Sequence, residues 1–119
     1  MITINGKEYN LFFGMKFLEE IDRIAGDKEL YDELGYLLAT AIYDVNLLSI
    51  AKLLKACLNT YPEIAPSDID EYLEIVDDKT LTRLVGFIKS TAKACNATKK
   101  VMKEAEKLMK KINQENKQN

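Results

Sequence analysis

Apolar and polar residues alternate on both sides of the dipeptide Asn5-Gly6 at the start of the chain. Asparagine followed by glycine favours a type I′ turn, because both central residues of that turn need a positive φ. The pattern therefore predicts a β-hairpin with one apolar face that continues through Leu11 and Phe13, and with the pairs Ile4–Lys7 and Ile2–Tyr9. A lone two-stranded hairpin is marginal in water, so we expect helices to cover this face.

Helical spacing of apolar residues follows the hairpin. It predicts a first helix over about residues 14–26, a second over about 28–43, and a third that Asn46 caps. Gly26 is expected to end the first helix with left-handed backbone, and Pro62 to stop the third.

The second half of the chain continues this pattern. Ser67 is the expected N-cap of a short acidic helix, and Asp77-Asp78 would break it and cap the last long helix. Near Cys95-Asn96 this helix is expected to kink or restart. The stripe that follows consists of Val101, Ala105, Leu108 and Ile112. Residues 113–119 are polar and are expected to fray.

These elements indicate a mainly α fold: an N-terminal β-hairpin followed by about five helices in a compact bundle, α+β by strict count. A chain of 119 residues suits one core. We expect a hairpin and helical body over residues 1–96. Residues 97–119 would form a basic amphipathic C-terminal helix and a frayed tail, either within the same domain or extending from it.

Charge separates the same two regions. Residues 99–119 hold seven Lys and three Glu, whereas residues 1–98 hold ten basic and sixteen acidic residues. An acidic body with a basic tail suggests different roles for the two. No apolar run approaches the roughly 18 residues that span a bilayer, and the N-terminus does not resemble a signal peptide. We therefore expect an intracellular protein with Cys57 and Cys95 as reduced thiols, a single disulfide being the alternative.

The sequence contains few residues that are suited to catalysis. The chain has no His, which removes the commonest general base and metal ligand. Its five Gly are scattered and form no phosphate-binding loop. The carboxylates at 68–78 lack the spacing of a calcium-binding loop, so they are interpreted as a solvated face with capping duties. The sequence thus predicts no enzyme, no cofactor and no metal.

Binding of nucleic acid is not expected either. The helix after Pro66 is acidic and would repel phosphates, which excludes it as a recognition helix. The basic C-terminal helix has no Arg and no aromatic residue, so it lacks the usual side chains for base reading and stacking. Its lysines form either a solvated face or a docking surface for an acidic protein segment.

The opening ITINGKEYNLFFGMKFLEEID resembles the N-terminal signature of tail assembly chaperones of long-tailed phages and prophages. The PSDIDEYLEIVD segment at 66–77 is similar to a Pro-led acidic helix of that family. The resemblance covers roughly residues 1–98 and is most specific in the first 25. Its structural signature consists of Asn5, Gly6, Phe13, Gly14, Phe17 and Leu18. In physical terms the turn sets the hairpin register, Gly14 allows a sharp corner, and the last apolar residues close the helix over the sheet.

The resemblance implies a non-enzymatic chaperone that binds the tape measure protein and helps recruit tail tube subunits during tail morphogenesis. Such a protein would act in the host cytoplasm and be absent from the mature virion. Many family members are also made in a frameshifted longer form. The alternative is a helical protein-binding adaptor or regulator from a mobile element. A homo-oligomer is also possible on physical grounds, because a two-stranded sheet has free edges that invite pairing.

A tape measure protein exposes long apolar helical stripes, so its chaperone needs an apolar groove with charged rims. The amphipathic segment 97–112 and the hairpin surface are the expected contacts. The methionines suit an adaptable interface. The residues predicted to bind a partner are Phe12, Met102, Lys103, Lys107, Leu108 and Met109.

Overall fold

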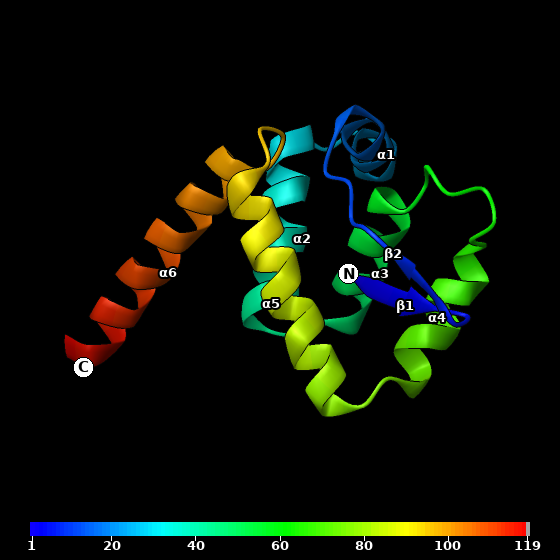
Figure 1. The fold of residues 1–119 in the computed structure, drawn as a ribbon. Coiled ribbons are helices and arrows are strands. Elements are labelled where there is room, and N and C mark those ends of the chain that lie inside the picture. Colours follow the sequence, from blue (N-terminus) through cyan, green and yellow to red (C-terminus); the bar gives the residue numbers. More distant parts are fainter. Residues whose placement is uncertain (119) are drawn as a thin grey trace.

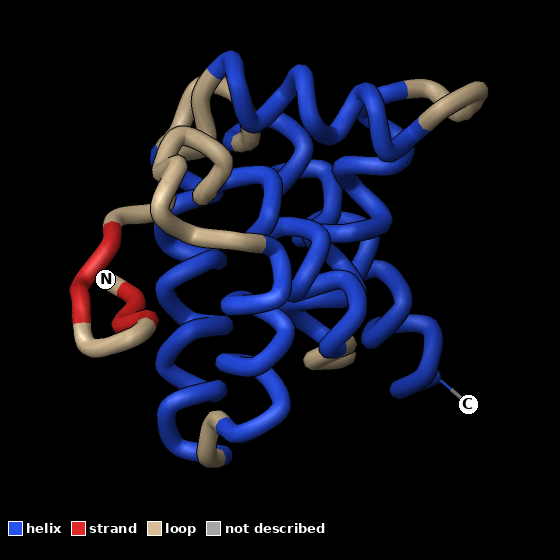
Figure 2. Tube along the Cα trace, turned by 90° about the vertical axis from the view of Figure 1, so that its right-hand side faces the viewer, coloured by secondary structure: helices blue, strands red, loops and turns tan. Residues whose placement is uncertain are grey.

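A computed structural model describes residues 1–118, which form a hairpin and six helices (Figure 1). The strands are β1 (Ile2–Ile4) and β2 (Lys7–Tyr9). The helices are α1 (Met15–Ala25), α2 (Leu30–Tyr43), α3 (Leu47–Cys57), α4 (Pro66–Ile75), α5 (Asp78–Ala94) and α6 (Lys99–Gln118). The predicted mainly α fold with an N-terminal hairpin is confirmed. The hairpin lies at the outside of the helical bundle (Figure 2).

The hairpin has the predicted register. Ile2 pairs with Tyr9 and Ile4 with Lys7 in an antiparallel ladder. The two turn residues have φ values of 53° at Asn5 and 78° at Gly6, as a type I′ turn requires. The side chains of Ile2, Ile4 and Tyr9 are buried, so the apolar face of the hairpin is covered.

Helix α1 is joined to the hairpin by an aromatic contact. The rings of Phe13 and Phe17 lie 4.8 Å apart between centroids, and both side chains are buried. Gly14, expected to be needed for a sharp corner, has φ −114°, which other residues adopt readily. Glycine is therefore not required there by the backbone. Gly26 does end the helix with a positive φ, at 61°, but its ψ of −118° is not that of the predicted left-handed cap.

Helix α3 is central to the core and packs against α1, α2 and α4. Its side chains Ile50, Leu53 and Leu54 are fully buried. Asn46 caps the helix as predicted, because its Oδ1 accepts a hydrogen bond of 3.0 Å from the backbone N–H of Ser49. The buried face of α2 covers the other side of α3.

The start of α4 differs from the prediction. Ser67 is not the N-cap, because the N-cap is Ala65 and the helix begins at Pro66, two residues earlier than a cap at Ser67 would place it. Proline suits a first helical position, since its missing N–H would have no partner there. The carboxylate of Asp68 instead accepts a hydrogen bond of 2.8 Å from the backbone N–H of Ala65. The expected cap at Asp77 is confirmed by a bond of 2.7 Å from the N–H of Thr80.

The last predicted helix is divided in two at the expected break. The chain turns through residues 95–98, where the buried Thr98 hydroxyl donates a hydrogen bond of 2.6 Å to the carbonyl of Ala92. Helix α6 then packs against both α2 and α5. It stays helical through Gln118, so the fraying expected from residue 113 is not found up to that residue. Asn119 lies outside the described residues.

Candidate functional site

The surface between α2 and α6 is a groove of about 380 Å³. Small residues form part of its lining, at Gly35 and Ala39 of α2 and at Ala105 of α6. Larger side chains line it as well, and several of them are well exposed: Tyr31 at 51%, Tyr36 at 60% and Leu108 at 58%. A smaller hollow continues the groove toward Asn96 and shares Tyr31, Val101 and Glu104 with it.

The groove exists because α6 leaves the body along its length (Figure 1). Its apolar stripe has helical spacing, so all its members lie on one face. At the start of the stripe Val101 is 9% exposed, whereas Leu108 is 58% and Ile112 39% exposed. The same face thus packs on the body at one end and opens to solvent at the other.

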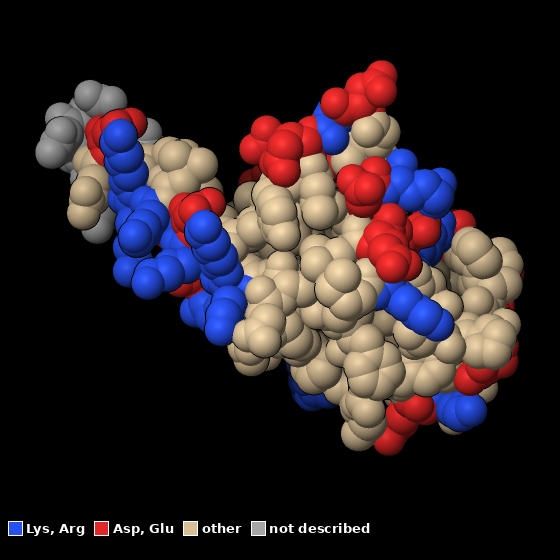
Figure 3. Space-filling view, turned by 90° about the horizontal axis from the view of Figure 1, so that it is seen from above, with Lys and Arg blue, Asp and Glu red and all other residues tan. Residues whose placement is uncertain are grey.

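An ion pair joins the first half of α6 to α5. The Lys93 ammonium of α5 lies 2.6 Å from the Glu106 carboxylate of α6. This contact with the Lys93 ammonium holds the pKa of Glu106 below its ordinary value. Figure 3 shows lysines gathered along the projecting helix, while acidic side chains gather on the body. The charge separation seen in the sequence is therefore also a separation in space.

The structure divides the residues that were predicted to bind a partner. Leu108 and Met109 line the groove together. Lys103 and Lys107 are exposed, but at 100° per residue they lie on the side of α6 that faces away from the apolar stripe. Met102 is 1% exposed and belongs to the core, so as placed here it offers no surface to a partner.

Phe12 lies on another part of the molecule. Its side chain is 47% exposed, as expected for a residue that points away from the apolar face. The ring stacks on Tyr61 at 5.9 Å between centroids, and Tyr61 in turn meets Tyr9 edge-on at 4.8 Å. The structure therefore does not bring Phe12 together with the groove residues of α6.

Sequence reasoning missed the α2 side of the groove. Sequence reasoning used only the main stripe of α2, which faces the core. A second stripe, at four-residue spacing, consists of Tyr31, Gly35 and Ala39. A run of small residues flanked by tyrosines on the outer side of an amphipathic helix was the available signal. It indicates that another helix can approach closely there.

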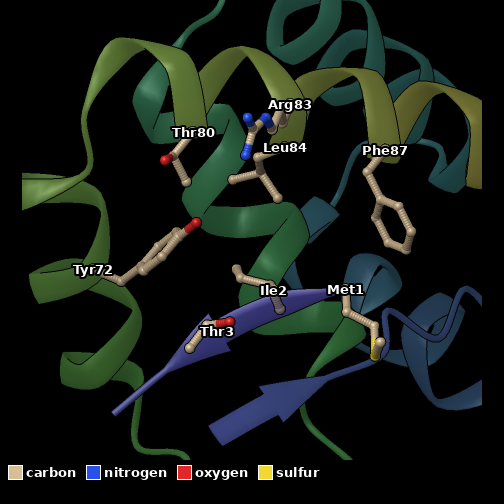
Figure 4. A pocket seen from close by; sticks show the side chains of 8 residues that line it. All are labelled: Met1, Ile2, Thr3, Tyr72, Thr80, Arg83, Leu84 and Phe87. Atoms are coloured by element: carbon tan, nitrogen blue, oxygen red, sulfur yellow. The ribbon is translucent and has the colours of Figure 1, made fainter. Parts of the chain in front are cut away.

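A second groove, of about 420 Å³, lies between β1, α4 and α5 (Figure 4). Strand β1 contributes Ile2 and Thr3, Met1 precedes the strand, and α4 contributes Tyr72. The side chains from α5 are Thr80, Arg83, Leu84 and Phe87. It shares no lining residue with the α2–α6 groove.

Chemistry-bearing groups do not gather at either groove. Within residues 1–118 no group of three or more His, Cys, Asp or Glu side chains is placed to hold a metal ion. Cys57 and Cys95 are free thiols, and burial raises the pKa of the Cys57 thiol far above its ordinary value. In the same part of the chain no helix combines the length and apolar character needed to cross a membrane.

Comparison with known proteins identifies the family of the chain. No curated protein and no solved structure matches the chain. The model of one protein family, described as phage tail assembly chaperone protein, matches residues 1–107, which include the hairpin, the first five helices and α6 up to Lys107. The groove residues Leu108 and Met109 follow directly after the matched region. Since this match covers most of its length, the chain belongs to the phage tail assembly chaperone family.

Proposed function

We propose that this chaperone holds an amphipathic helical segment of the tape measure protein in the α2–α6 groove. The observation that carries the proposal is the change in exposure along α6, from 9% at Val101 to 58% at Leu108. An apolar stripe that is packed at one end and open at the other has space for one further helix. Helix-in-groove recognition uses such stripes, with anchor side chains at helical spacing.

The composition of the groove supports this type of partner. Tyr31 and Tyr36 present large, semi-rigid side chains, which are common among residues that dominate binding energy. Gly35 allows the close approach of Val101 of α6, and Ala39 further along α2 keeps the groove shallow enough for a partner helix. Removing exposed apolar surface from water contributes a favourable free energy of roughly 25 cal/mol per Å², from which the entropic cost of association is subtracted, so binding favours a partner helix that covers much of this stripe.

The positive charge on the outer side of α6 supports the solubility of the complex and not the specificity of binding. Lys103 and Lys107 lie on the outer side of α6, where they stay hydrated when the groove is filled. A cationic outer face also attracts acidic segments over a distance of about 8 to 10 Å at ordinary salt. Of the residues predicted to bind a partner, the proposed site keeps Leu108 and Met109, and it adds Tyr31 and Tyr36 of α2.

Three parts of the role follow from family membership and are proposed with it. The chaperone would help recruit tail tube subunits, act in the host cytoplasm before the tube polymerises, and be absent from the finished virion. A homo-oligomer remains a further proposal. Light scattering that shows a strict monomer at high concentration would contradict it.

Co-expression with fragments of the tape measure protein tests the groove. We expect the wild-type chain to keep an apolar helical fragment soluble and to co-purify with it. Tyr36→Asp and Leu108→Asp place an uncompensated charge in the groove, and each should reduce the co-purified fragment at least about tenfold. Circular dichroism and melting temperature show whether both variants remain folded.

A matched control is available on α4. Ile75 is 84% exposed and does not line the α2–α6 groove, so Ile75→Asp makes a similar change elsewhere. This variant should bind like the wild type. If the groove variants fold and still co-purify with the fragment as the control does, the proposed site is wrong.

A further inference from the structure

The hairpin leaves backbone hydrogen-bonding groups free on β1. Ile4 and Lys7 flank the two-residue turn, so they form a hydrogen-bonded pair, and the next pair, Thr3 and Glu8, is a non-hydrogen-bonded one. The N–H and C=O of Thr3 therefore point away from β2. Figure 4 shows that this outer edge of β1 faces the groove beneath α5.

The walls of this groove suit an extended chain. Leu84 and Phe87 of α5 and Tyr72 of α4 supply apolar surface, and the whole hollow measures about 420 Å³. An added strand places alternate side chains on opposite sides of its backbone. One set would then point toward the helices and the other toward solvent.

Arg83 gives the groove a specific charge. Its guanidinium lines the hollow, and within residues 1–115 it forms no ion pair with a carboxylate. Arg23, by contrast, is paired with Glu20. A guanidinium presents five N–H donors in a planar fork that matches a carboxylate. The Asp77 carboxylate lies near enough for the charge of Arg83 to help lower its pKa, but the two side chains form no ion pair. The groove therefore combines a free strand edge, apolar walls and a cation that no carboxylate of the described residues holds in an ion pair.

We propose that this groove binds an extended, acidic polypeptide segment of another protein. The segment adds to β1 as a third strand, through backbone hydrogen bonds to Thr3, and places one carboxylate against Arg83. Main-chain pairing gives affinity in this type of recognition, and the pockets for alternate side chains give specificity.

A second copy of the chain fits this edge less well. Helix α5 walls the side of the groove opposite β1 (Figure 4). The β1 strand of another copy carries its own α5 on the same edge, so pairing the two strands would bring both helices into the same space. A single free segment meets no such obstacle. The proposal is also independent of the α2–α6 groove, because the two share no lining residue.

Selection from a random ten-residue peptide library tests the proposal on the full chain. Peptides are selected on the wild type after removal of those that also bind Thr3→Pro. This substitution deletes the outward N–H and leaves the hairpin ladder intact, since proline is tolerated at a free strand edge. We expect enriched peptides to combine alternating apolar residues with Asp or Glu, and to bind Arg83→Gln about tenfold more weakly.

A matched control removes the same group from the opposite edge. Glu8→Pro deletes the outward N–H of β2, and the selected peptides should bind this variant like the wild type. Methylating single backbone nitrogens of a selected peptide should weaken binding at every second position, as strand pairing requires, and this readout needs no folded variant. Failure to enrich any peptide, equal binding to Arg83→Gln, or insensitivity to backbone methylation would each overturn the proposal.

Discussion

At a few positions of this chain the backbone conformation, and not side-chain contacts, decides which residue types are favourable. Asn5 and Gly6 both have positive φ, and the Asn-Gly pair made this turn predictable. Val45 also has a positive φ, of 49°, between α2 and α3. A branched side chain is unfavourable in that region, so the sequence carried no signal for it. Local rules therefore identify turns built from permissive residues and miss those that the surrounding helices impose.

Replacing Gly6 with Ala tests the turn directly. The φ of 78° is strained for a residue with a Cβ, even though no heavy atom lies within 4 Å of the place that the Cβ would take. We expect the free energy of unfolding in urea to fall by about 1–2 kcal/mol. Gly86→Ala is the control, because Gly86 lies within α5 with open space around it and should gain about 0.5–1 kcal/mol. Equal effects at both sites would contradict this account.

At the scale of elements, capping side chains set where helices begin. Asn46 and Asp77 each accept a backbone hydrogen bond at the start of the following helix, and both caps could be read from the sequence. The start of α4 could not be read from the sequence, because Pro66 and Ser67 are both suitable start signals. The hydrogen bond from the N–H of Ala65 to Asp68 accompanies the start at Pro66. These two start signals place the first helical residue two positions apart, and the choice decides which side chain caps the helix.

The cap at Asp77 should make stability depend on pH. The hydrogen bond from the N–H of Thr80 lowers the pKa of Asp77 in the folded chain. A lowered pKa means that this contribution is fully present above the unfolded value of about 3.9 and is lost as pH falls through the folded value. Asp77→Asn keeps an acceptor but does not titrate there, so its unfolding midpoint in urea should fall less than that of the wild type from about pH 5 to pH 2.

A remaining slope is expected in that variant, because the pKa values of Glu20 and Glu106 are also lowered by their partners Arg23 and Lys93. Asp78→Asn makes the same change of charge one residue later and leaves the cap intact. It should keep the acid sensitivity of the wild type. Identical pH profiles for the Asp77 and Asp78 variants would contradict the assignment of the cap.

At the scale of the molecule, the sequence predicted the elements and their buried faces better than the site. The stripes of α1 to α5 need a single core, so their inward residues followed from spacing alone. The stripe of α6 is used twice, by the body near Val101 and by the groove near Leu108. Spacing cannot tell where a helix leaves its core, so Met102 and Leu108 looked equivalent. The α2 side needed the position of α6, which only the tertiary arrangement supplies.

This division of α6 predicts different effects along one helix. Met102 is buried, so Met102→Ala should lower the free energy of unfolding by about 2–5 kcal/mol. A chain that ends at Lys110 loses residues whose side chains are exposed from 111 to 115, and its stability should stay within about 0.5 kcal/mol of the wild type. Urea denaturation of both proteins makes the comparison. If the truncation lowered the free energy of unfolding as much as Met102→Ala does, the outer half of α6 would support the fold. Its exposed stripe would then not be available to a partner.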